Sequence, residues 1–219
     1  MQIRVIHTSQ MLTNTYVVLN GDKAFVVDAG GEAEEIARVL SEEGAELEAI
    51  LLTHAHFDHI GAVKRLVEIE AQKSGREASV FLHKADVDKI SSYKNMGFAV
   101  GAKVQPFTPD VLLVGGETIN VAGINIKVIH TPGHTKGGVC YVAKDVIFSG
   151  DTLFAGSYGR TDFYDGSFKE IKNSIVNKLF RLEGEYRVLP GHGDETTLMR
   201  EKKLNAILSA SDEEFGLID

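Results

Sequence analysis

Short apolar runs alternate with segments of helical spacing along the first part of the chain. Runs typical of β-strands occupy residues 3–7, 16–19, 24–28, 49–53 and 80–83. Two segments between them repeat apolar residues every three or four positions, which predicts amphipathic helices, one ending near Glu43 and one running from Ile60 to Glu70. Gly44 is the expected stop signal of the first helix. This alternation predicts an α/β fold.

The second half of the chain is richer in strands. Five strand-like runs with Gly-Gly, Ala-Gly and Lys-Asp turns predict antiparallel hairpins at residues 111–114, 118–121, 124–130, 138–142 and 146–149. Ser167 and Glu170 fit a capping box and predict a helix whose apolar face extends to Leu179. A last strand is expected at residues 187–189, a last helix at 198–208 and loops at 86–109. The two series predict two packed sheets with helices outside.

Composition is that of a globular protein with one domain. The 219 residues are 43% hydrophobic and 25% charged, which are average values for soluble domains. We expect neither secretion nor membrane insertion, because no apolar stretch has the length of a signal peptide or a bilayer span. The single cysteine, Cys140, lies in an apolar run, which predicts a buried thiol and fits the cytoplasm. The net charge of −8 disfavours a nucleic-acid partner.

Three histidines and an aspartate occupy six positions directly after the apolar run at residues 49–53. The alternating pair His54 and His56 can share one ion where a strand ends, since residues i and i+2 face one side. Asp58 and His59 point elsewhere once the chain turns, so that the segment could serve two ions. The alternative interpretation is an ordinary polar loop. Four ligand-type residues at this spacing favour a metal site.

Three further candidate ligands each follow a predicted strand and lie beside glycine. They are His134, Asp151 and His192. Glycine lets the backbone approach an ion closely and permits unusual backbone angles. Taken alone, each residue could equally be a turn histidine or a helix-capping aspartate. Together with the first motif they indicate a larger metal centre.

These residues, in this order, resemble the metal-ligand set of the metallo-β-lactamase fold superfamily. The resemblance covers about residues 16–192 and implies a four-layer αβ/βα sandwich of two mixed sheets, with a C-terminal helix and acidic tail at 193–219 within one domain of residues 1–219. It implies that one ion is held by His54, His56 and His134, the other by Asp58, His59 and His192, and that Asp151 bridges them. We expect two divalent ions, with zinc first and iron or manganese as alternatives.

The segments that follow Asp151 and His192 resemble the glyoxalase II-like branch. That likeness implies hydrolysis of a glutathione thioester such as S-lactoylglutathione, by a hydroxide shared between the ions and oriented by Asp58 as catalytic residue. Arg160 and Phe163, in the branch motif Gly159-Arg160-Thr161-Asp162-Phe163, are the candidate substrate contacts. Few residues follow His192, so the chain resembles short members of the branch. The helical region that contacts glutathione in longer members is not expected here.

Other functions compete with this prediction. Persulfide dioxygenases look like the same branch and use one iron, and a lactone or another ester could replace the thioester. A structural metal site in a binding protein ranks lower, because structural sites are closed four-ligand sets. The resemblance also implies that a chain with the Asp58-His59 pair does not hydrolyse β-lactams. The remaining histidines, His7, His83 and His130, are expected to be structural.

Overall fold

The computed structural model describes residues 1–210 and contains two six-stranded sheets. The first sheet follows the chain in order: β1 (Gln2–Thr8), β2 (Thr13–Asn20), β3 (Lys23–Val27), β4 (Glu46–Leu51), β5 (Ser79–His83) and β6 (Val111–Leu113). Strands β1 to β3 pair antiparallel, whereas β3 to β6 pair parallel. The first sheet is therefore mixed, as expected.

The second sheet has a more scrambled order. From edge to edge it contains β14 (Thr196–Thr197), β13 (Arg187–Pro190), β10 (Val146–Gly150), β9 (Val139–Ala143), β8 (Ile124–His130) and β7 (Thr118–Val121). Strand β13 runs parallel to β10, and the other pairs are antiparallel. A separate two-stranded ribbon pairs β11 (Leu153–Phe154) with β12 (Ser157–Tyr158). The short strands β11, β12 and β14 were not predicted.

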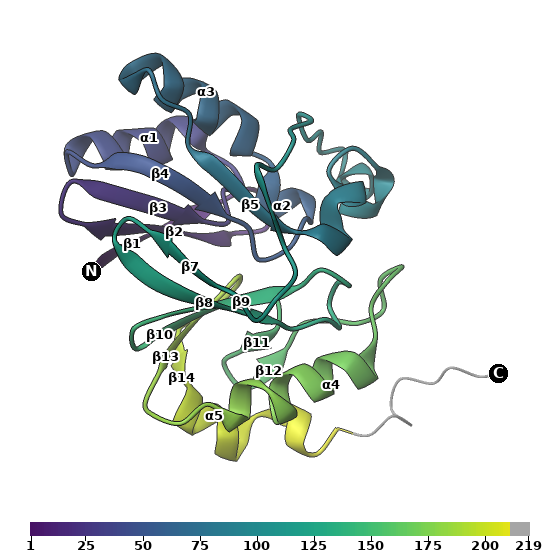
Figure 1. The fold of residues 1–219 in the computed structure, drawn as a ribbon. Coiled ribbons are helices and arrows are strands. Elements are labelled where there is room, and N and C mark those ends of the chain that lie inside the picture. Colours follow the sequence, from purple (N-terminus) through teal and green to yellow (C-terminus); the bar gives the residue numbers. More distant parts are fainter. Residues whose placement is uncertain (211–219) are drawn as a thin grey trace.

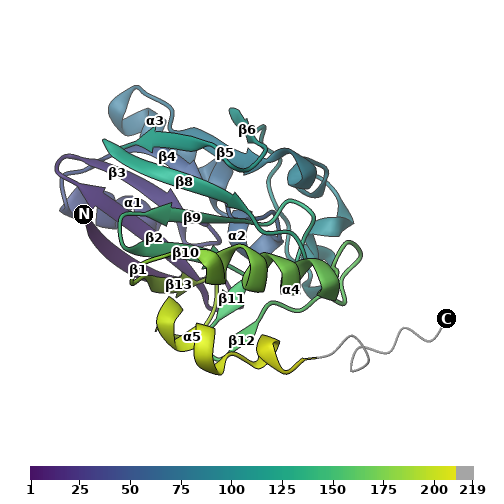
Figure 2. The same ribbon diagram turned by 60° about the horizontal axis from the view of Figure 1, so that its bottom comes forward.

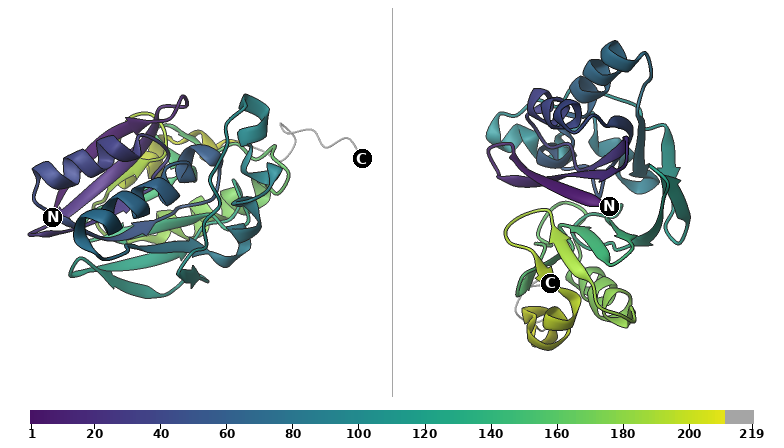
Figure 3. Two further views of the ribbon diagram at one scale, coloured as in Figure 1. Left: turned by 90° about the horizontal axis from the view of Figure 1, so that it is seen from above. Right: turned by 90° about the vertical axis from the view of Figure 1, so that its left-hand side faces the viewer.

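The sheets pack face to face and helices cover their outer faces, as Figure 1 shows from the side and Figure 3 from two further directions. Helices α1 (Ala33–Glu42) and α3 (Val63–Ser74) lie over the first sheet. Helices α4 (Phe168–Asn177) and α5 (Leu198–Leu204) lie over the second. The predicted four-layer αβ/βα sandwich is confirmed.

Side chains that alternate between the two faces of each strand form three apolar cores, one between the sheets and one between each sheet and its helices. In β2, Val17 and Leu19 face the helices, whereas Tyr16 and Val18 face the other sheet. Both faces of β2 are consequently buried, which explains its nearly continuous apolar run. The middle layer is pure side-chain packing between sheets and includes the edge-on contact of Phe25 with Phe148, whose ring centres are 6.4 Å apart.

Two sequence predictions, one about strand pairing and one about helix length, were wrong. Residues 111–114 were expected to form a hairpin with the following strand, but β6 pairs parallel with β5 at the edge of the first sheet. The sequence around β6 does not indicate this pairing, because β5 lies far from it along the chain. The last helix was expected to run to residue 208, but α5 ends at Leu204 because Asn205 adopts an extended conformation and caps the 3-10 helix Ala206–Leu208.

Residues 86–109 were expected to be loops and instead carry short 3-10 helices. These are Lys84–Lys89, Tyr93–Asn95 and Gly97–Val100. The predicted helix start is confirmed, since Ser167 Oγ accepts a hydrogen bond from the Glu170 amide at the start of α4. The second bond of a capping box is not made by Glu170, because the Ser167 amide donates to the Gly133 carbonyl instead. The predicted acidic tail at 211–219 lies outside the described residues. None of the helices within residues 1–210 has the length and apolar character needed to cross a membrane.

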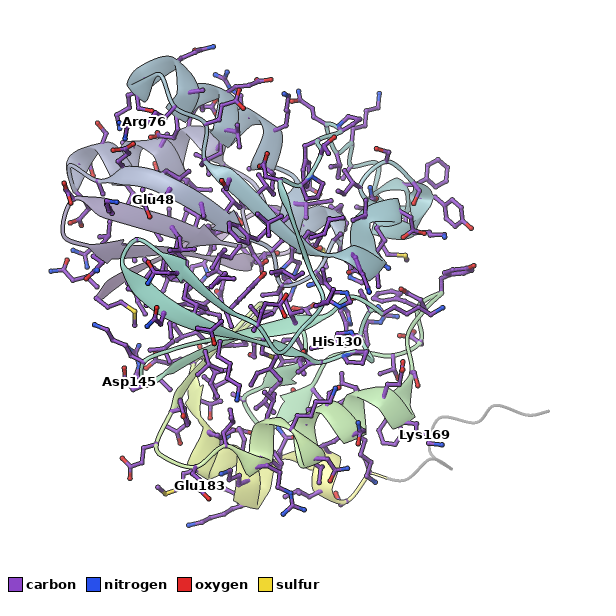
Figure 4. The ribbon with its side chains drawn as sticks, viewed as in Figure 1. Glu48, Arg76, His130, Asp145, Lys169 and Glu183 are labelled. Carbon is purple, nitrogen blue, oxygen red and sulfur yellow. The ribbon has the colours of Figure 1, made fainter. Side chains whose placement is uncertain are left out.

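The ends of several strands meet at one edge of the sandwich. Strands β8, β10 and β13 run in the same direction, because β8 and β10 are each antiparallel to β9 and β13 is parallel to β10. Figure 2 shows these strands from below. In Figure 4, His130 at the end of β8 and Asp145 before β10 lie at opposite ends of the second sheet. The loops at the His130 end carry the candidate ligands.

Candidate metal centre

The structure brings all seven predicted ligands together between the two sheets. His54 and His56 lie in the loop after β4, and Asp58 and His59 lie on the short helix α2 (Phe57–Ile60). His134, Asp151 and His192 follow β8, β10 and β13. Their ligand atoms form three clusters, each with all atoms within 4.8 Å of one another: His54, His56 and His134; His54, His59 and Asp151; Asp58, His59 and His192.

The first ligand set is His54, His56 and His134, and all three side chains are buried. Nδ1 of His56 lies 3.1 Å from Nε2 of His54 and 2.9 Å from Nε2 of His134. Three ring nitrogens thus converge on one point. This is the set expected to hold the first ion.

Hydrogen bonds on the far side of two rings fix their tautomers. The Arg160 carbonyl can only accept, so Nδ1 of His134, 2.8 Å away, must donate to it. The Thr53 hydroxyl donates to Asp28 and therefore accepts from Nδ1 of His54 at 3.0 Å. In the neutral rings, Nε2 of both histidines then carries a lone pair that points toward His56.

This arrangement tests whether a metal ion fits the first set. A single hydrogen on Nδ1 of His56 can serve only one of the two facing lone pairs well, and Nε2 of the same ring is buried without a hydrogen-bond partner among residues 1–210. Burial and the neighbouring imidazoles hold the pKa of His54 and of His56 well below the ordinary value, so both rings are neutral. Converging neutral imidazoles are the donor set of a divalent transition metal.

The second ligand set is Asp58, His59 and His192. Oδ2 of Asp58 lies 3.2 Å from Nε2 of His192 and 3.6 Å from Nε2 of His59. Asp58 also accepts a hydrogen bond of 2.9 Å from the Thr13 hydroxyl, which orients the carboxylate. The two ligands from α2 thus meet a histidine from the far end of the chain.

Asp151 lies between the two sets. Its Oδ2 is 3.4 Å from Nε2 of His134, in the first set, and 3.6 Å from Nε2 of His192, in the second. Its Oδ1 is 3.5 Å from Nε2 of His59, and both of these atoms are buried without a hydrogen-bond partner in the described part of the chain. This position suits a carboxylate that contacts two ions, and two facing orphan atoms fit an ion between them.

The carboxylates dominate the electrostatics of the second set. Burial by itself would lower the pKa of His59, but Asp151, Asp58 and Asp28 outweigh it and raise that pKa to about 10. Burial would likewise raise the pKa of Asp58, but His59, His192 and the Thr13 hydroxyl lower it below the ordinary range. The carboxylates thus favour a positive charge at the second set.

Gly191 allows the loop of His192 to approach the cluster. A Cβ atom at this position would lie 2.2 Å from Oδ1 of Asp151 and 2.7 Å from Cε1 of His59. Distances this short are incompatible with any side chain. Steric crowding by Asp151 and His59 thus explains why a glycine precedes His192.

Asp28 positions a ligand and was missed by sequence reasoning. Its Oδ2 lies 2.9 Å from Nδ1 of His59, while Asp28 also accepts bonds from the Thr53 amide and hydroxyl. Because Nδ1 donates to this carboxylate, Nε2 of His59 faces the cluster. The available signal was an aspartate at a strand end near glycines, the pattern already seen at Asp151.

Arg160 and Phe163 lie beside the first set. The Phe163 ring centre is 5.1 Å from that of His56, so this side chain borders the centre. The Arg160 guanidinium lies 4.3 Å from the centre of the Phe163 ring. It also donates two hydrogen bonds, of 2.7 and 2.6 Å, to the Asp162 carboxylate. It is 62% exposed, whereas its backbone carbonyl orients His134. Substrate contact by either side chain stays a prediction.

The residues expected to be structural lie outside the clusters. His83 and His130 stack on each other with ring centres 4.2 Å apart. Cys140 is buried in β9, and burial raises the pKa of its thiol to about 11. Such a thiol is inert at neutral pH.

Comparison with known proteins places this geometry in a family. The model of the metallo-beta-lactamase superfamily matches residues 9–192, which include all seven ligand positions. The chain belongs to the metallo-beta-lactamase superfamily. The predicted resemblance is thereby confirmed.

Relatives within the superfamily match over nearly their full length. "Probable metallo-hydrolase YqgX" of Bacillus subtilis is 34% identical, with 95% of this chain and 98% of the relative covered. "Hydroxyacylglutathione hydrolase GloC" of Haemophilus influenzae is 33% identical, with 96% and 99% covered. Their names support a metallo-hydrolase and leave the substrate of this chain to be tested.

Two solved structures of the superfamily share the fold. The BLEG-1 B3 metallo-beta-lactamase has a TM-score of 0.88 and 33% identity, over 95% of this chain and all of that one. TTHA1623 in a di-iron-bound form has a TM-score of 0.81 and 34% identity, over 93% and 98%. The relatives thus carry different functional descriptions on one scaffold.

Proposed function

We propose that this protein is a metal-dependent hydrolase of thioesters, with a hydroxyacylglutathione such as S-lactoylglutathione as its substrate. One observation carries the proposal: two sets of candidate ligands lie side by side, with Asp151 between them. A structural site would need only four closed ligands. The relative named as a hydroxyacylglutathione hydrolase, aligned over 99% of its length, supports the choice of substrate.

The two sets would hold two divalent ions. The first set offers only imidazoles, and the second adds carboxylate oxygen, a combination that suits zinc and also accepts iron or manganese. The di-iron form of TTHA1623 makes iron the main alternative. When bound, such ions supply Lewis-acid chemistry: they lower the pKa of water and polarise a carbonyl oxygen.

The side chains of this chain have separate parts in the proposed reaction. Asp58 stays ionised and is held by Thr13, so its carboxylate can accept a hydrogen bond from the attacking water and orient it. Phe163 forms an apolar wall beside the first set, against which the acyl part of a substrate can lie. Cys140 takes no part, because its thiol is buried in a strand and protonated.

Binding of an anionic glutathione moiety needs a cation near the centre. Arg160 is the candidate, since its guanidinium lies over the Phe163 ring. Asp162 neutralises that charge, so the substrate carboxylate would have to compete with Asp162 for Arg160. We infer a small-molecule substrate in the cytoplasm, with neither a nucleic-acid nor a membrane partner, from the charge of −8 and the single thiol.

A substrate panel tests the proposal against its rivals. The purified protein, with its metal content measured, would be assayed for thiol release from S-lactoylglutathione, oxygen uptake with glutathione persulfide, and hydrolysis of a lactone and a cephalosporin. The cephalosporin is included because BLEG-1 is described as a metallo-beta-lactamase. Thiol release as the dominant activity supports the proposal. Oxygen uptake with one iron per chain, or β-lactam cleavage as the faster reaction, would replace it.

A further inference from the structure

A buried network of three charges lies beside the first ligand set. Nζ of Lys89 is 2.8 Å from Oδ1 of Asp86 and 2.5 Å from Oδ2 of Asp165. The side chains of Asp86, Lys89 and Asp165 are 0%, 2% and 7% exposed. Burying three charges is costly unless each is paired and hydrogen-bonded, so this triad calls for an explanation that the ligand motifs do not provide.

Asp86 fixes the backbone of two ligand loops at once. Its Oδ2 accepts hydrogen bonds from the Ala55 amide at 3.1 Å and the Thr135 hydroxyl at 2.8 Å, and its Oδ1 accepts one from the Gly137 amide at 2.8 Å. Ala55 lies between two histidines of the first set, and Thr135 directly follows the third. One carboxylate thus holds the backbone beside all three members of that set.

Close packing leaves this carboxylate little freedom. A Cβ atom at Gly137 would lie 2.5 Å from both Cγ and Oδ1 of Asp86. The loop after His134 therefore wraps tightly around the carboxylate. A shift of Asp86 would be transmitted to both loops, because a close-packed interior does not absorb displacements.

Asp165 connects the triad to the segment that carries Arg160 and Phe163. Besides Lys89, it accepts a hydrogen bond of 3.2 Å from the Lys136 amide, in the loop after His134. Lys89 is the cation between two carboxylates, and without it Asp86 and Asp165 would repel each other across a buried contact. Lys89 thereby holds the substrate-side segment and both ligand loops in one arrangement.

The second ligand set has a separate support. His59 is oriented by Asp28, and Asp58 by Thr13. None of the hydrogen bonds of the triad among residues 1–210 reaches a residue of α2 or the loop of His192. The triad is consequently placed to affect one ligand set and not the other.

We propose that Asp86, Lys89 and Asp165 are positioning residues that set the metal affinity of the first ligand set without contacting the ion. The inference rests on the metal centre of the proposed function, not on its substrate. Residues that orient metal ligands from behind typically change affinity by about 10- to 100-fold when they are replaced. We expect a change of the same size in the metal affinity of the first ligand set, and not in that of the second.

A zinc titration of the metal-free full chain against a chromophoric chelator tests this. Lys89→Met keeps the length of the side chain and removes its charge. Lys94→Met is the matched control, since Lys94 pairs with Asp88 in the same region and lies over the Tyr164 ring, and none of these contacts within residues 1–210 reaches a ligand loop. His56→Ala and His192→Ala identify which binding step belongs to which set. Circular dichroism checks that each variant is folded.

His56→Ala should abolish the zinc-binding step of the first ligand set. We expect Lys89→Met to weaken zinc binding at that step by about 10- to 100-fold, and to change the affinity of the other step by no more than about twofold. Lys89→Arg should restore most of the loss. If Lys89→Met does not fold, Asp165→Asn, at the more exposed end of the triad, should weaken the same step by a smaller factor.

Three outcomes would overturn the inference. Unchanged affinities in Lys89→Met and Asp165→Asn would show that the triad has no positioning role. Equal weakening of both steps would show a general loss of stability. A wild-type chain that binds no ion would remove the metal centre, and the proposed function with it. Site-selective weakening without any thioesterase activity would support the triad and reject only the substrate.

Discussion

Oδ2 of Asp28 lies 2.9 Å from Nδ1 of His59, both side chains being buried, and the same carboxylate binds the backbone and side chain of Thr53. Asp28 is held with φ of 57°, a left-handed conformation that is uncommon for residues other than glycine. Backbone strain of this kind persists where surrounding contacts over-determine it. The contact determines which nitrogen of His59 faces the cluster.

Asp28→Asn should therefore weaken the second ion specifically. The amide is neutral and can present its NH₂ group, which would compete with the donors that now surround the carboxylate. We expect the affinity at the second set to fall by about 10- to 100-fold, while the first set changes little. Zinc titration measures both steps. The exposed Asp22→Asn is the control, and an identical response of the two variants would refute a role of Asp28.

Removal of a single candidate metal ligand should have the largest effect on activity. Asp151→Ala and His56→Ala should reduce metal-dependent thioester hydrolysis to background and still yield a folded chain, since these residues serve the centre rather than the apolar core. Circular dichroism and turnover on the same samples provide the test. Full activity of either variant without metal would rule out the proposed chemistry.

Gly191→Ala tests the close approach of the last ligand loop. Its Cβ would lie 2.2 Å from Oδ1 of Asp151, so the loop or the Asp151 carboxylate must move and binding of the second ion should weaken. Gly193→Ala is the matched control, because Gly193 has φ of 72° but no atom within 4 Å of the position that its Cβ would take. The control should lose about 1–2 kcal/mol of stability from backbone strain and keep its metal. Equal metal content in both variants would contradict the steric argument.

Metal binding at the two sets should depend differently on pH. The carboxylates raise the pKa of His59 to about 10 and also raise that of His192, so an ion entering the second set must displace protons near neutrality. Its apparent affinity should rise with pH between about 6 and 9, by about tenfold per pH unit for each proton released.

The first set should behave otherwise, because the pKa values of His54 and His56 are lowered and these rings are already neutral. Its affinity should rise less steeply than that of the second set over the same pH range. Calorimetry in buffers of different ionisation enthalpy counts the protons released at each step. Proton release on binding to the first set only, or to neither set, would be inconsistent with these electrostatics.

The Arg160–Asp162 pair offers a test of substrate binding. If Arg160 binds a glutathione carboxylate, Asp162→Asn should free the guanidinium and lower KM, whereas Arg160→Gln should raise KM, each by a few-fold with kcat little changed. Steady-state kinetics with S-lactoylglutathione measures both. No change in KM for either variant would place the glutathione moiety elsewhere.

The grouping of the seven candidate ligands could be predicted from the sequence, because four lie within six positions after a strand and the other three each follow a strand and lie beside glycine. The residues that position these candidate ligands could not be predicted from the sequence. Asp28 and Asp86 act on residues 31 positions away, His59 and Ala55, through contacts that only the packed sheets create. The pairing of β6 with β5 was missed for the same reason, and the neutralisation of Arg160 by Asp162 depends on side-chain geometry rather than on pattern.

Stepwise addition of metal to the metal-free chain, with thiol release from S-lactoylglutathione followed at each step, tests the central claim most directly. Two ligand sets that share Asp151 predict that the hydrolysis rate rises and then levels off at two equivalents of zinc or iron per chain. Absence of thiol release at every metal loading would contradict the account.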